Sequence, residues 1–194
     1  MKGKRSIIIV AIVVALIVAA FAYVSIRTPK TVESTKEISE LDELMSKNIQ
    51  TVYPATPREV IKLYNRYVLY LHGENNSKLS DDEVHKLGAK MRDLYDAELL
   101  EVNPEDTYFM NLNSELASYR DRSKVMLQAN VCDSNEVEFI DINGAEGALA
   151  QASYFCKEGS KDFTRTYQQY LMRKDSNGNW KILGFVKMDG GTES

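Results

Sequence analysis

The spacing of apolar residues along this chain changes once, just after Ser123. Before that point, apolar side chains recur at intervals of three and four residues, which is typical of amphipathic helices. From Val125 to Cys132 every second residue is apolar, which is the period of a β-strand. A run of helices followed by a run of strands predicts an α+β domain in which the helices pack on one face of an antiparallel sheet.

The starts of three helices can be predicted from capping signals. Residues 56–59 (TPRE) form a capping box with proline at the first helical position, and we expect this helix to end near Gly73. A second box at residues 80–83 (SDDE) starts a helix that runs toward Leu100. A third helix is expected to begin at residues 103–106 (NPED).

Four strands are expected after the third helix. The first is bent near residues 133–135, and Asn143-Gly144, a strong hairpin signal, follows it. The expected strands cover about residues 124–142, 148–157, 163–174 and 180–187. Antiparallel sheets of this kind curl and leave a concave side, so the order and lengths resemble the nuclear-transport-factor-2-like fold, a cone of curved sheet wrapped on helices.

Three stretches give the chain a narrower resemblance: residues 53–66 (YPATPREVIKLYNR), 152–160 (ASYFCKEGS) and 166–185 (TYQQYLMRKDSNGNWKILGF). Together with the apolar N-terminus they resemble an uncharacterised family of membrane-anchored proteins from low-GC Gram-positive bacteria. The resemblance covers about residues 40 to 187. It implies the fold and the membrane placement, and it implies no catalytic residues.

The membrane placement rests on an uncharged run of 20 residues, Ile7 to Ile26. An α-helix of this length spans about 30 Å, the thickness of the hydrocarbon core of a bilayer. Three basic residues in MKGKR precede the run, and acidic residues follow it, so we expect a cytoplasmic N-terminus and an exported C-terminal domain at the cell membrane. The alternative is a signal peptide cleaved after Ala22, because residues 20–22 (AFA) have the small-x-small form of a cleavage site.

The expected organisation therefore has five parts. They are a basic N-terminus (1–5), a transmembrane helix (6–26), a juxtamembrane stalk (27–55), an extracytoplasmic α+β domain (56–188) and a tail (189–194). The stalk carries Ile38, Leu41, Leu44 and Met45 at helical spacing, which predicts a short amphipathic helix. That helix could pack on the domain, lie on the membrane or pair with another copy, and packing on the domain is the simplest of the three. The oligomeric state stays open.

Two cysteines, Cys132 and Cys156, leave two alternatives. If Asn143-Gly144 turns a regular hairpin, residues whose numbers sum to 287 or 288 face each other, and the two cysteines satisfy this condition. An exported domain would permit such a disulfide. A bulge of one residue would instead place the cysteines on opposite faces as two buried, unpaired side chains.

The charge and the motifs exclude several function classes. The net charge is −4 although three basic residues lie in the first five positions, so the exported part is more acidic still, which argues against a nucleic-acid partner. No phosphate loop, nucleophile elbow or zinc motif occurs, so no cofactor or metal site is expected. Of the two histidines, His72 falls at a helix C-terminus, where it would interact with the helix dipole, and His85 falls on a solvated helix face.

The eleven tyrosines suggest the only candidate site. A concave side of the sheet could be lined by Tyr64, Tyr67, Tyr154, Tyr167 and Trp180. Because Tyr167 and Tyr170 differ by three positions, only one of them can face that side of a regular strand. The simpler alternative is ordinary core packing with the hydroxyls at the rim.

Two functions follow as hypotheses. The first is a non-enzymatic binding or assembly module at the outer membrane face, with an envelope protein as partner. The alternative is a small-ligand binder or an enzyme that uses the concave pocket, and it requires an open cavity with a buried, perturbed carboxyl or histidine. The absence of a catalytic motif favours the first hypothesis, and a cavity filled by Tyr and Leu side chains would exclude the second.

Overall fold

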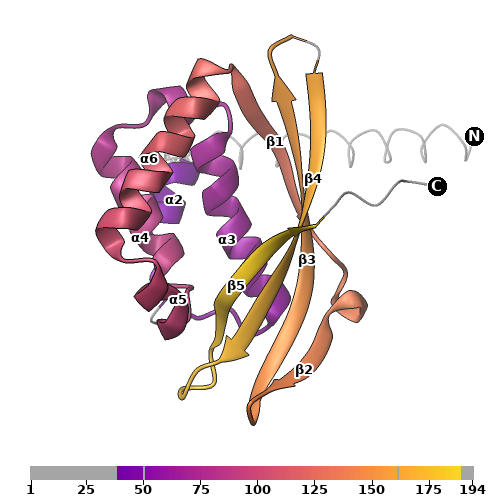
Figure 1. Cartoon of the computed structure of the whole chain (residues 1–194). Coiled ribbons are helices and arrows are strands. Elements are labelled where there is room, and N and C mark those ends of the chain that lie inside the picture. Colours follow the sequence, from indigo (N-terminus) through magenta and orange to yellow (C-terminus); the bar gives the residue numbers. More distant parts are fainter. Residues whose placement is uncertain (1–38, 50, 161, 189–194) are drawn as a thin grey trace, which may run out of the picture. The chain divides into compact units, whose positions relative to one another are not determined.

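The computed structural model describes residues 39–49, 51–160 and 162–188 (Figure 1). Within these residues a layer of helices lies on one side of an antiparallel sheet, so the α+β class is confirmed. The helices are α2 (Glu40–Ser46), α3 (Pro57–His72), α4 (Asp81–Arg92), α5 (Ala97–Val102) and α6 (Glu105–Asp121). The strands are β1 (Lys124–Val131), β2 (Glu138–Ile142), β3 (Ala145–Glu158), β4 (Asp162–Lys174) and β5 (Trp180–Met188).

The expected membrane helix at residues 6–26 lies outside the described residues. Among the residues that are described, no helix has both the length and the apolar character needed to cross a bilayer. The compact unit begins at Ser39, because α2 packs on the domain and buries Leu44 completely. Ile49 is 2% exposed, so the second half of the expected stalk contributes to the core.

The capping box at the start of α4 forms as the sequence predicts, whereas at the start of α3 the Glu59 carboxylate bonds to the amide of Ala55 rather than to that of Thr56. The Thr56 side chain accepts a hydrogen bond from the Glu59 amide at 3.2 Å, and the Glu59 carboxylate accepts one from the Ala55 amide at 3.0 Å. At the start of α4 the reciprocal bonds between Ser80 and Glu83 are both present. These local bonds satisfy amide groups that a helix leaves unpaired at its start, which explains why short motifs locate the helices so well.

The second predicted helix is divided into α4 and α5. The segment between them forms a short bridge with β5, in which the Asp96 amide donates to Ile182 O at 2.8 Å and the Ile182 amide to Leu94 O at 2.9 Å. Asp96 then caps α5 by accepting from the Glu98 amide at 3.0 Å. The connection is thus tied to the sheet, and Tyr95 is held at the junction between the two layers.

The sheet has five strands where four were expected. Its order is β1-β3-β4-β5, and β2 pairs with the first half of β3 beyond the end of β1. The expected first strand is interrupted by a 3₁₀ turn, η2 (Ser134–Glu136), in which the Asp133 amide donates to the Glu136 carboxylate at 2.7 Å. The hairpin turn at Asn143-Gly144 is confirmed, and both residues have the positive φ that such a turn requires.

The interruption at η2 also decides the cysteine question. It shifts the register of β1, so that Cys156 faces Met126, while the amide of Cys132 donates to Gln151 O at 2.9 Å. The two cysteines therefore lie about 16 Å apart along β3, given a rise of about 3.3 Å per residue. Both are free, so the disulfide interpretation is wrong.

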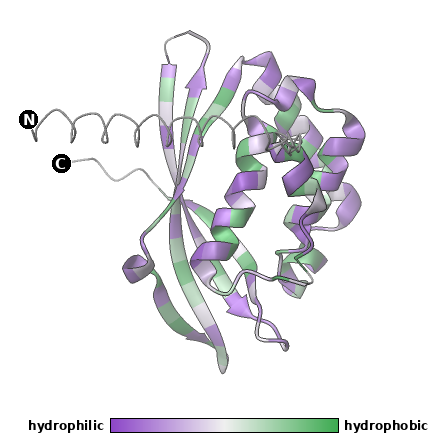
Figure 2. Cartoon of the chain, turned by 180° about the vertical axis from the view of Figure 1, so that it is seen from behind, coloured by the Kyte–Doolittle hydropathy of each residue, from purple (hydrophilic) through white to green (hydrophobic). Residues whose placement is uncertain are grey.

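The core lies between the two layers, and hydrophobic segments occur in both of them (Figure 2). On β3 the inward positions Ala148, Ala150 and Ala152 are at most 2% exposed, and these small side chains let α3 approach the sheet closely. Further along the same strand the inward residues are Tyr154 and Cys156. The candidate site lies between the layers at this end.

Candidate functional site

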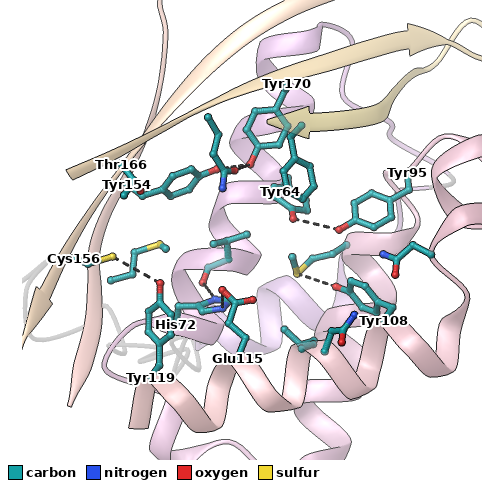
Figure 3. Close-up of a pocket in the computed structure, with 18 of the residues that line it drawn as sticks. Tyr64, His72, Tyr95, Tyr108, Glu115, Tyr119, Tyr154, Cys156, Thr166 and Tyr170 are labelled. Atoms are coloured by element: carbon teal, nitrogen blue, oxygen red, sulfur yellow. Dashed lines mark hydrogen bonds and ion pairs between the residues drawn. The ribbon is translucent and has the colours of Figure 1, made fainter. Parts of the chain in front are cut away.

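A cavity of about 310 Å³ lies between α3, α4 and α6 on one side and strands β3, β4 and β5 on the other (Figure 3). Six tyrosines line it: Tyr64, Tyr95, Tyr108 and Tyr119 from the helical layer, and Tyr154 and Tyr170 from the sheet. Its rim contains the exposed residues Asn111, Glu115 and Phe185. The cavity is at the lower end of the size range of small-molecule sites, with room for about ten water molecules.

The lining follows from the periodicity of each element. On α3 the cavity residues are Tyr64, Val68 and His72, spaced four residues apart, and therefore on one face. On β4 they are Thr166, Gln168 and Tyr170, spaced two apart and therefore on one side of the sheet. The same patterns that bury the core thus place a row of polar and aromatic side chains around a space.

One wall of the cavity is a network of polar side chains. The Tyr154 hydroxyl donates to Asn65 Oδ1 at 2.7 Å, the Tyr170 hydroxyl donates to Gln168 Oε1 at 2.9 Å, and the two phenol oxygens lie 2.5 Å apart. The two phenol hydrogens cannot supply all three of these contacts, and the amide nitrogen of Asn65, Nδ2, is buried without a hydrogen-bond partner. Exchanging the amide oxygen and nitrogen of Asn65 would supply the missing hydrogen and use its orphaned donor. These side chains hydrogen-bond to one another, so this wall of the cavity is preorganised.

Burial keeps the cavity phenols neutral. It raises the pKa of Tyr64 and Tyr170 well above the usual value of 10, and it also raises the pKa of Tyr154 and Tyr108. Tyr64 and Tyr95 share a hydrogen bond of 3.3 Å. The Tyr119 hydroxyl has only a sulfur partner, Cys156 Sγ at 3.9 Å, which is a weak interaction. The Tyr119 hydroxyl is therefore weakly bonded and can form a stronger hydrogen bond with a ligand.

The other end of the cavity carries its ionisable groups. His72 is only 4% exposed, and its Nδ1 lies 3.0 Å from Val68 O, which can only accept a hydrogen bond. Its Nε2 lies 3.4 Å from Glu115 Oε1. The His72 imidazole holds the pKa of Glu115 below its usual value, against the opposing effect of burial, and Lys124 acts in the same direction. Lys124 Nζ lies 4.7 Å from the centre of the Tyr119 ring.

Two of the five predicted pocket residues, Tyr64 and Tyr154, line this cavity. Of the pair on β4, Tyr170 faces inward and Tyr167 does not. Tyr67 is buried beneath α2, where its hydroxyl reaches Leu44 O at 3.5 Å. Trp180 packs at the far end of the sheet against Phe139, with 5.9 Å between ring centres. The predictions that Tyr67, Tyr167 and Trp180 line the cavity are therefore wrong. The presence of aromatic residues in a helix or strand does not reveal which face or which end of the sheet each of them occupies.

One of the two histidines lies where the sequence predicts, and the other does not. His85 lies on an exposed face of α4, as expected, where it stacks on Phe109 at 4.1 Å between ring centres. His72 was expected only to interact with the dipole of α3, yet it points into the cavity. Its position four residues after Val68 and eight after Tyr64 was the signal that could have identified it. Glu115 lies on α6, 43 positions after His72, and its spacing therefore carried no such signal.

The residues present suit binding and proton exchange. Among the described residues, no group of three or more His, Cys, Asp or Glu side chains is placed to hold a metal ion.

A family model described as "Domain of unknown function (DUF6715)" matches residues 1–185. None of the curated proteins matches the chain significantly.

Proposed function

Since the chain belongs to the DUF6715 family, a domain of unknown function, its role has to be argued from its geometry, and we propose that it binds a small organic molecule in the tyrosine-lined cavity. The observation that carries this proposal is the open cavity itself. Six tyrosines at these positions could have filled the gap between the layers, and they surround a space of about 310 Å³ instead. Aromatic walls with a few placed polar groups are typical of small-molecule sites.

The role proposed is binding without turnover. The buried imidazole of His72 and the carboxylate of Glu115 are one pair of interacting groups, and Lys124, the other charged side chain among the described lining residues, lies at the same end of the cavity. Binding needs only the shape and the polar groups already described. The helices covering a curved sheet support a nuclear-transport-factor-2-like cone as the finer description of the fold.

The placement is part of the proposal. The uncharged run from Ile7 to Ile26 and the basic residues before it support an N-terminal anchor, with the binding domain outside the cytoplasm. A cavity held at the outer membrane face would meet molecules that arrive from outside or leave the membrane.

A partner protein in the envelope is a second candidate, favoured by apolar groups on the outer face of the sheet. Phe163 is 54% exposed and stacks on Phe155 with 5.5 Å between ring centres, and Val186 is 61% exposed. Mild crosslinking of whole cells, followed by detergent extraction of membranes, tests the anchor and this partner together. We expect the protein at full length in the membrane fraction, and a shortened soluble protein would contradict the proposed anchor. A crosslinked band that is present for the unaltered protein and lost in Phe163→Ser would establish the partner.

The cavity is tested by filling it. Thr166 is half-buried on β4 with its side chain toward the cavity, so Thr166→Trp should occupy the space without removing a core residue. We expect the affinity for a neutral aromatic probe, phenylacetamide, to fall at least about tenfold, as measured by calorimetry or ligand-observed NMR.

The matched control is Gln169→Trp, which places the same ring on the opposite face of the same strand. It should leave the affinity for the probe unchanged. Equal loss in both variants, or no binding of the probe to the unaltered protein, would contradict the proposed function.

A further inference from the structure

The pairing of His72 with Glu115 indicates what kind of group this end of the cavity can bind. Because Nδ1 of His72 faces the Val68 carbonyl oxygen, this nitrogen carries a hydrogen. Nε2 then faces a carboxylate oxygen at 3.4 Å. This nitrogen is buried and makes no hydrogen bond among the described residues. A buried and unpartnered imidazole nitrogen that faces a carboxylate is therefore part of the cavity wall.

The carboxylate that now meets this donor comes from the rim. Glu115 has a side chain that is 57% exposed, whereas the His72 side chain is 5% exposed. Glu115 can thus turn to solvent at little cost, but His72 has no other described partner for Nε2. Lys124 and the weakly bonded Tyr119 hydroxyl lie at the same end. When Glu115 turns away, these groups leave a position suited to another anion.

The charges around the cavity disfavour a cationic ligand, which is the usual alternative for an aromatic-lined site. Two of the ring faces are already occupied by cations of the protein itself. Arg92 lies 5.1 Å from the centre of the Tyr108 ring, and Lys124 lies 4.7 Å from that of Tyr119. Among the described residues that line the cavity, Glu115 is the only carboxylate, and it lies next to His72. The remaining charge at this end is positive.

We propose that the ligand is a small carboxylic acid, whose carboxylate takes the place of Glu115 beside His72, Lys124 and Tyr119. The apolar part of the ligand lies among the rings of Tyr64, Tyr95 and Tyr170. Glu115 is then an internal stand-in for the ligand, which keeps the buried imidazole paired when the cavity is empty. This inference rests on the proposed function, because it names the ligand class of the same cavity.

The test compares acids with their amides on the full chain in detergent micelles. The probes are phenylacetate and hexanoate, each with its neutral partner, phenylacetamide and hexanamide, and affinities are measured by calorimetry. We expect each acid to bind about tenfold more tightly than its amide, because a charge-assisted hydrogen bond is stronger than a neutral one. Amides that bind as tightly as the acids would overturn the inference.

Two variants at exposed or half-buried positions separate this inference from a change in folding. Glu115→Gln removes the competing charge and should strengthen acid binding severalfold with no change for the amides. Lys124→Met should reduce the preference for acids to within about threefold. If Glu115→Gln weakens the acids, the inference fails. If the amides still bind and Thr166→Trp weakens their binding, the proposed function stands without this inference. If no probe binds at all, the proposed function and the inference both fail.

Discussion

Raising the pH from about 9 to about 12 is expected to unfold the domain in one cooperative transition, in which phenolate absorbance rises as secondary structure is lost. The cause is the burial of Tyr64, Tyr154 and Tyr170, which raises the pKa of each phenol above its usual value. Tyr67 behaves in the same way, since burial raises its pKa to about 12. In the unfolded chain these groups ionise near pH 10.

The sign of the effect follows from this difference. A folded-state pKa above the unfolded value means that the contribution to stability is fully present below about pH 10 and is lost as the pH rises toward the folded-state pKa. In that window the contribution of each buried phenol to the free energy of unfolding falls by about 1.4 kcal/mol per pH unit. At about pH 12, four such phenols together lose about 10 kcal/mol, which is comparable to the whole stability of a domain of this size.

A matched pair of variants tests the assignment. Tyr64→Phe removes one buried phenol with only a 3.3 Å hydrogen bond to Tyr95, so the midpoint of alkaline unfolding should move to higher pH. Tyr167→Phe, on the outer face of β4, should not move it. Titration of all tyrosines near pH 10 with the secondary structure intact would show that water reaches the phenols freely, and the burial argument would then be wrong.

The parts of the fold that depend on local chemistry could be predicted from the sequence. The boxes at Thr56 and Ser80 fix two helix starts through bonds that span three or four residues. Asn143-Gly144 fixes the hairpin because few other residues accept its backbone angles. The split of the first strand also has a local cause, the turn at η2, but alternation continues on both sides of it and conceals the break.

The site could be predicted only in part, because it depends on register and on distant partners. The shift at η2 separates Cys132 from Cys156, and no periodicity before the turn reveals its size. The choice of Tyr170 over Tyr167 follows from the pairing of β4 with β3, which the spacing alone leaves open. His72 and Glu115 meet because α3 and α6 lie side by side, and neither residue belongs to a motif.

The same limit applies to an ion pair that holds the junction of α4, α5 and the sheet. Arg173 on β4 donates two hydrogen bonds to the Asp96 carboxylate, at 2.7 and 3.2 Å, and a third to Glu98 at 2.8 Å. The Asp96 side chain is 5% exposed, and it also caps α5. Asp96 is 77 positions away from Arg173, so the pair could not be seen in the sequence.

Asp96→Ala is expected to lower the free energy of unfolding by about 3–5 kcal/mol, since it removes the buried carboxylate that accepts two of the three hydrogen bonds of Arg173 and also removes the cap of α5. The single tryptophan, Trp180, is 5% exposed, so its fluorescence during urea denaturation measures the change. Glu98→Ala is the control: it removes another carboxylate from Arg173, but the Glu98 side chain is 64% exposed, and the expected loss is below about 1 kcal/mol. Equal losses in the two variants would contradict the assignment, because burial of Asp96, rather than the number of bonds to Arg173, is what makes its removal costly.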